Sequence, residues 1–196
     1  YHYREAGEGA PAETAYRWAV KAAQQAMAAY APSEAVPLYR SALELADAVG
    51  LSLGEKALLL RDLAEAQRGA GDFEGRIESL EEAARELEAA GDVAEAARSC
   101  SWLAGGLLWQ GQLERALRFA EKGLELVGPA DRAERAMLLA YHALTSLCLH
   151  RFDTAFEEAA EAESLAEHVT DPLIRASLPM PIAWLYWFGC FPQKAR

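Results

Sequence analysis

The most informative segment of this chain is CSWLAGGLLWQGQLERALRFAEKGLELV, which occupies residues 100–127. In its first half, apolar residues recur at the three- and four-residue spacing that places them on one face of a helix. Gly111 interrupts this pattern, and a second helical pattern of mostly small residues begins at Leu113. Small residues at that spacing let two helix axes approach closely. The segment therefore predicts a hairpin of two packed helices.

The marks of this hairpin recur along the whole chain with a nearly constant period. A small residue early in each second helix serves as an anchor, and successive anchors are separated by 41, 40, 39 and 40 residues. These anchors are Ala35, Arg76, Ala116, Ala155 and Ala195, among which Arg76 breaks the small-residue rule. Another small residue lies twelve positions before each anchor, at Ala23, Ala64, Ala104, Ala143 and Ala183. Such a period predicts a row of stacked helical hairpins.

The composition agrees with an all-helical fold, because Ala, Leu and Glu dominate and strand-favouring runs are absent. We expect one helical-repeat domain over residues 1–196. The chain opens at Tyr1 without a methionine and stops just after the fifth anchor, which predicts a fragment of a longer protein with an incomplete last repeat. In that last repeat, Pro179 and Pro181 each remove a backbone hydrogen bond. The helix is therefore predicted to kink or break near Met180.

The spacing of these residues resembles the tetratricopeptide repeat. In that family a large residue, a Leu-small pair and an aromatic mark the first helix, and small residues mark the second. The second repeat of this chain carries Leu60, Leu63, Ala64 and Gln67, then Arg76, Leu80 and Ala83. The resemblance implies an all-α, right-handed superhelical solenoid of hairpins, here with a period near 40 where the family's usual value is about 34.

A period near 40 is also similar to that of the helical repeats in large bacterial regulators, the maltose-activator-like and LuxR-type signal-transduction ATPases. The opening HYREAG and the alanine-rich segment after it resemble the start of the repeat region in those proteins. This second resemblance implies the sensor segment of a transcriptional regulator. The nucleotide-binding and DNA-binding parts of such a protein would lie outside this chain.

On each first helix, residues one, four and five positions after the small mark point away from the second helix. In the resembled family that side lines the concave groove in which partners bind. The groove candidates in the second repeat are polar, namely Arg61, Glu65 and Arg68. Those in later repeats are apolar, namely Leu108, Trp109, Leu144, Leu147, Cys148, Trp184, Trp187 and Phe188. Aromatic side chains with few charges are typical of the centre of a binding surface.

Two structural alternatives stay open for these candidates. Packing against a neighbouring helix explains the aromatic residues Trp184, Trp187 and Phe188 more readily than contact with a ligand does. A solvated ion-pair face likewise explains the charged residues of the second repeat more readily than a binding site does.

Charge and cysteine content limit the classes of partner. The formal net charge of −11 disfavours direct contact with nucleic acid and with anionic membranes. No apolar run approaches the roughly 18 to 20 residues of a spanning helix, and no signal peptide opens the chain. Three cysteines, an odd number, indicate reduced thiols and a cytoplasmic setting.

The sequence contains no convincing catalytic, metal or cofactor site. Cys148 and His150 lack the further ligands that zinc requires. His142 lies on the apolar stripe and is predicted to be a packed core histidine. The carboxylates of the acidic helix are interpreted as a solvated surface: Glu157, Glu158, Glu161, Glu163 and Glu167. We therefore predict a protein that is not an enzyme and that needs no cofactor.

Three functional hypotheses follow. The first is a non-catalytic scaffold that binds a protein, a peptide or a small-molecule inducer as the sensor segment of a bacterial transcriptional regulator. The second is a general protein–protein interaction adaptor without a small ligand, whose groove also allows homo-oligomers. The third, an enzyme, has only scattered His and Cys residues in its favour.

Overall fold

The computed structural model describes residues 12–128, 130–170 and 172–189. All regular structure in these ranges is helical. The chain divides into two compact units, one ending at Asp92 and one beginning at Val93, and each is described by itself. The last anchor, Ala195, and one of the three cysteines, Cys190, lie outside the described residues.

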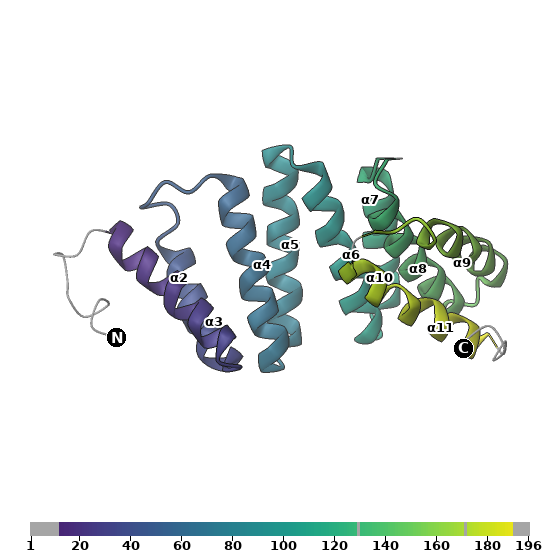
Figure 1. The fold of residues 1–196 in the computed structure, drawn as a ribbon, viewed down its shortest axis with the longest axis horizontal. Helices are drawn as coiled ribbons and strands as arrows, with labels where there is room; N and C mark the ends of the chain where they lie inside the picture. The colour runs from purple at the N-terminus through teal and green to yellow at the C-terminus, as the bar shows by residue number, and fades with distance from the viewer. Residues whose placement is uncertain (1–11, 129, 171, 190–196) are drawn as a thin grey trace. The chain divides into compact units, whose positions relative to one another are not determined.

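The N-terminal unit consists of two helical hairpins (Figure 1). Helices α2 (Ala12–Ala28) and α3 (Pro32–Glu44) form the first, and α4 (Leu53–Ala70) and α5 (Phe73–Ala90) form the second. The hairpins pack together through α3 and α4. Helix α4 begins with a reciprocal capping box, because Ser52 accepts a hydrogen bond from the Glu55 N–H and the Glu55 carboxylate accepts one from the Ser52 N–H.

The C-terminal unit contains two further hairpins and the first helix of a fifth repeat (Figure 1). Helices α6 (Val93–Trp109) and α7 (Leu113–Leu126) form one hairpin, and α8 (Arg132–Cys148) and α9 (Phe152–Ala166) form the other. The fifth repeat supplies α10 (Pro172–Ser177) and α11 (Pro179–Phe188). Helix α8 lies at the centre of this unit, in contact with α6, α7, α9 and α11.

The residues that repeat in the sequence are those at which the helices meet. The anchors Ala35, Ala116 and Ala155 are completely buried, whereas the larger Arg76 is partly buried. In the first helices, the small residue of the fifth repeat, Ala183, is partly buried, whereas those of the other four repeats are completely buried: Ala23, Ala64, Ala104 and Ala143. A larger side chain at these places would separate the helix axes, so their size fixes how closely each hairpin closes.

The turn between the two helices of each hairpin uses a left-handed residue at the same period. Gly71 and Gly111 have φ angles of 79° and 72° in the second and third repeats. The first and fourth repeats place Tyr30 and His150 there, with φ angles of 56° and 61°. A side chain other than glycine is strained in this conformation. Two of the four turns therefore carry a local energetic cost.

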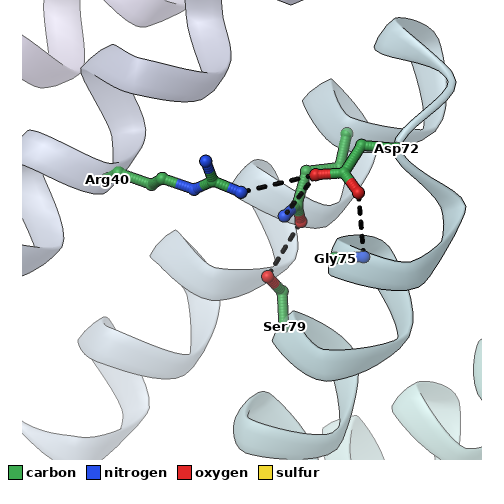
Figure 2. Close-up of polar contacts among 5 residues, drawn as sticks. Arg40, Asp72, Gly75 and Ser79 are labelled. Carbon is green, nitrogen blue, oxygen red and sulfur yellow. Dashed lines mark hydrogen bonds and ion pairs between the residues drawn. The ribbon is translucent and has the colours of Figure 1, made fainter.

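A polar cluster fixes the turn between α4 and α5 (Figure 2). Asp72 accepts hydrogen bonds from the Gly75 N–H at 3.0 Å and from the Gln67 amide at 3.4 Å. Gln67 is buried and accepts a 2.8 Å hydrogen bond from the Ser79 hydroxyl. Arg40 of α3 reaches the Asp72 carboxylate at 3.3 Å. The cluster thus joins the first repeat to the turn of the second.

The first helix of the fifth repeat is interrupted where the prolines predicted it. The interruption falls at Leu178, two residues before Met180. Leu178 keeps right-handed helical angles, with φ −61° and ψ −37°, and its N–H donates to the Ile174 carbonyl at 2.8 Å. Pro179 and Pro181 have no N–H. Neither residue can therefore donate the backbone hydrogen bond that a continuous helix would make to the carbonyl four residues earlier.

The carboxylates predicted to form a solvated surface on the acidic helix, α9, are mostly exposed, and the structure adds contacts that the sequence did not predict. The predicted solvated carboxylates include three that have specific partners. Glu158 contacts the His142 ring at 2.6 Å, and Glu161 forms an ion pair with Arg135 at 3.0 Å. Glu163 accepts a 3.0 Å hydrogen bond from the Tyr186 hydroxyl. The partners come from α8 and α11, which a sequence pattern confined to α9 does not reveal.

Candidate functional site

The polar groove candidates lie on α4 in the N-terminal unit. Arg68 and Glu65 form an ion pair at 2.9 Å, three residues apart on the same helix. Both side chains remain substantially exposed, and such pairs contribute little to stability or binding. Arg61 is partly buried. This geometry agrees with the ion-pair alternative for the second repeat.

The apolar candidates lie in the C-terminal unit, where six of them line one open pocket of about 210 Å³. The walls come from the ends of α6 and α8, the start of α7 and one face of α11. The lining residues are Leu108, Trp109, Leu113, Leu144, Cys148, Trp184 and Phe188. The six predicted residues lie on three separate helices, α6, α8 and α11, and the fold brings them together.

Aromatic contacts arrange the pocket wall between α6 and α11. The rings of Trp109 and Trp184 meet edge to face, with centroids 4.7 Å apart. Phe188 lies one turn after Trp184 on α11, and their ring centroids are 5.3 Å apart. Edge-to-face arrangements are favourable for aromatic pairs. All three side chains stay well exposed, at 50% for Trp109, 41% for Trp184 and 53% for Phe188.

The opposite face of α11 holds that wall in place. Tyr186 is buried, stacks on Phe156 of α9 with a centroid distance of 6.5 Å and donates its hydroxyl to Glu163. Burial and the Glu163 carboxylate raise the pKa of Tyr186 to about 12. The phenol therefore stays protonated and keeps donating at any physiological pH. Trp184 and Phe188 are positioned by this anchoring.

The pocket floor carries no charge. Leu144 is buried, and Cys148 follows it by one turn on α8. Desolvation raises the pKa of the Cys148 thiol, so the group is neutral near pH 7. Among the described residues, no group of three or more His, Cys, Asp or Glu is arranged to hold a metal ion. Apolar contact is the chemistry that this lining offers.

Two predicted groove residues lie outside the pocket, and one lining residue was missed. Leu147 is buried at 5% exposure in the packing around α8. Trp187 points elsewhere on α11 and is 67% exposed. Leu113 lines the pocket although it belongs to a second helix. The available signal was its position three residues before an anchor, where Phe73 and Phe152 also stand.

Comparisons with known proteins show similarity at the level of structure only. No protein-family model and no curated protein sequence matches the chain. A structure of the TPR-like repeats of a protein described as a kinesin light chain from Podosopora anserina superposes with a TM-score of 0.70 at 18% identity, covering 94% of this chain and 90% of that one. BtubC (BKLC) from P. vanneervenii gives a TM-score of 0.71 at 19% identity, covering 94% and 82%.

Two further solved structures have a similar fold at lower sequence identity. The MamA protein superposes with a TM-score of 0.64 at 14% identity, covering 92% of this chain and 86% of that one. Aspartyl phosphate phosphatase F from Bacillus subtilis gives 0.69 at 13% identity, covering 95% and 58%. The predicted all-α, tetratricopeptide-like repeat fold is therefore confirmed. In the part of the chain that the structure describes, no helix is long and apolar enough to cross a membrane.

Proposed function

We propose that this chain is a protein-binding scaffold and that its C-terminal unit takes a peptide segment of a partner into the pocket between α6, α8 and α11. The single observation that carries the proposal is the open apolar pocket with exposed tryptophans on its rim. Exposed aromatic side chains around a concave apolar surface are the usual centre of a protein interface. The repeat fold of the similar structures supports the same class of function.

The size of the pocket favours a side chain over an entire small molecule. Its volume of about 210 Å³ is below the roughly 300 to 1,000 Å³ of sites that enclose drug-sized ligands. The lining also lacks the convergent polar groups that orient a small ligand. A partner that inserts one apolar side chain and lies across the rim fits both properties.

The narrower role of a sensor segment in a bacterial transcriptional regulator stays a prediction. It rests on the similarity of the opening residues and of the repeat period to those regulators. A small inducer and self-association likewise stay predictions. A peptide-binding pocket is compatible with a sensor whose signal is another protein, so the proposal and the narrower role stand together.

The proposal is tested with peptides selected on the intact chain. A random peptide library displayed on phage is panned against the protein, and selected peptides are labelled and titrated by fluorescence anisotropy. Trp109→Ala removes one wall of the pocket and is expected to weaken binding roughly tenfold or more. The matched control is Trp18→Ala, because Trp18 is 52% exposed on α2 in the other unit.

Two results would contradict the proposal. One is the selection of peptides that bind the wild type and Trp109→Ala equally well, which would place the binding surface elsewhere. The other is repeated panning that yields no peptide with saturable binding. Circular dichroism of both variants ensures that a loss of binding is not a loss of fold.

A further inference from the structure

The position of Cys148 has an equivalent in every repeat. The residues seven positions before the anchors of the first to fifth repeats are Ala28, Gly69, Trp109, Cys148 and Phe188, at intervals of 41, 40, 39 and 40. Two of these are large aromatics, and both contribute to the pocket wall. Cys148 is the small side chain between them in sequence order. At this place a thiol, not a ring, follows Leu144 on α8 and lines the pocket.

The N-terminal unit shows what happens when the equivalent place is closed. There Pro32 packs directly against Gly69, and a Cβ atom added to Gly69 would lie only 2.9 Å from the Pro32 Cβ. Pro32 stands three residues before its anchor, as Leu113 does in the third repeat. In the C-terminal unit the corresponding pair is Leu113 and Cys148, and both line the open pocket. The same place between consecutive repeats is therefore filled in one unit and vacant in the other.

We propose that Cys148 determines which partner side chain the pocket accepts, and that this side chain is an uncharged aromatic ring carried on a basic peptide segment. The inference rests on the proposed function, and it specifies the partner. An apolar protein cavity of about 150 Å³ binds benzene, so about 210 Å³ holds a phenyl ring with limited space to spare. Trp184 and Phe188 offer edges and faces for aromatic pairing, which favours a ring over an aliphatic side chain.

The charge of the protein specifies the residues that flank the ring. The formal net charge of the chain is −11. Helix α9 packs against α8 and α11, which line the pocket, and it contains five carboxylates and no Lys or Arg within its bounds. Asp153 and Glu157 among them are exposed. A partner segment with Lys or Arg beside the ring is attracted by this field, and its affinity falls as salt rises.

The test uses the peptides selected on the intact chain, each remade with Phe, Trp, Leu or Ala at the ring position. Cys148→Phe introduces the side chain that the fifth repeat carries at this place and fills the pocket. Affinity for the Phe peptide is expected to fall roughly ten- to a hundredfold. The matched control is Ala160→Phe, which adds the same bulk at an exposed position of α9. It should leave the affinity unchanged.

Cys148→Ala makes the opposite change and is available if Cys148→Phe does not fold. It enlarges the pocket, so the affinity for the Trp peptide relative to the Phe peptide is expected to rise several-fold. Peptides whose binding requires Trp109 but is the same for wild type, Cys148→Phe and Cys148→Ala would overturn this inference and leave the proposed function standing. Selected peptides that lack aromatic residues would also overturn it. If no selected peptide depends on Trp109 for binding, the proposed function itself is contradicted.

Discussion

Nδ1 of His142 lies 2.6 Å from Oε2 of Glu158, and this contact ties α8 to α9 in the fourth repeat. The other ring nitrogen, Nε2, lies 3.8 Å from Oε1 of Glu121 on α7. His142 is almost completely buried, so it is a core histidine as the sequence predicts, but one with two carboxylate neighbours. A single imidazole therefore links the second helices of two consecutive repeats through the helix between them.

We expect the stability of the protein to depend on the protonation of His142. Burial acts to lower its pKa, but the hydrogen bond to Glu158 and the charges of Glu158 and Glu121 outweigh it, so the pKa is raised above 6.5. The stabilising contribution is thus fully present below about pH 6.5 and is lost as the pH rises through the folded-state pKa. His142→Gln should lower the free energy of unfolding by about 1–2 kcal/mol near pH 5.5 and by less near pH 9.

Urea unfolding of the wild type and His142→Gln at the two pH values measures this difference. His168→Gln, at an exposed position after α9, serves as the control. Equal destabilisation by His142→Gln at both pH values would show that the ring contributes packing alone.

Glu134 on α8 gives a second pH dependence in the same unit. The residue is only 3% exposed, and burial raises the pKa of its carboxyl above 4.5, although Arg98 lies 3.5 Å away. A raised carboxyl pKa gives stability that is present below about pH 4.5 and is lost as the pH rises through the folded-state value. Relative to the wild type, Glu134→Gln should therefore gain stability as the pH rises above about 4.5. Thermal denaturation at several pH values measures the trend, and a constant difference would contradict it.

Gly75 is expected to be intolerant of alanine, although alanine normally stabilises a helix. A Cβ atom there would collide with the Asp72 carboxylate and lie 2.5 Å from the Gln67 amide nitrogen (Figure 2). Gly75→Ala should lower the free energy of unfolding by about 1–3 kcal/mol. Gly54→Ala is the control, because nothing lies within 4 Å of its added Cβ, and it should stabilise by up to about 1 kcal/mol. Chemical denaturation measures the free energy of unfolding of both variants. Stabilisation by Gly75→Ala, as by Gly54→Ala, would exclude a steric clash at Gly75.

The left-handed turn of the first repeat offers a stabilising substitution. Tyr30 has a φ angle of 56° and a side chain that is 95% exposed, so replacing it removes strain and little contact. Tyr30→Gly is expected to raise the free energy of unfolding by about 0.5–1 kcal/mol. Gly71→Ala, at the equivalent turn of the second repeat, should change it in the opposite direction. Melting temperatures test the pair, and destabilisation by Tyr30→Gly would mean that the tyrosine makes a compensating contact.

Much of the fold is predictable from the sequence because hairpin packing depends on residue size. The buried anchors Ala35, Ala116 and Ala155 are small for a steric reason, and steric constraints repeat with the fold. The interruption near Met180 is predictable because proline lacks an N–H. The partners of Glu158 and Glu163 are not predictable in this way. Those contacts depend on which turn of a neighbouring helix lies opposite, which the period alone does not specify.

The candidate pocket is predictable in part for the same reason. Helical periodicity groups Leu108, Trp109 and Trp184 as groove candidates, and in the structure all three line one pocket. It does not show that Leu113 reaches the same space from the start of α7, or that Leu147 is enclosed by the packing around α8. A pocket forms where neighbouring side chains fail to fill a volume. That property belongs to the packed structure and not to any one helix.

The most direct test is a crystal structure of the chain with a selected peptide bound. We predict that an aromatic side chain of the peptide lies between Trp109 and Trp184, against Leu144 and Cys148. A peptide seated instead on α4, beside Arg61, Glu65 and Arg68, with the pocket empty, would contradict the proposed binding site.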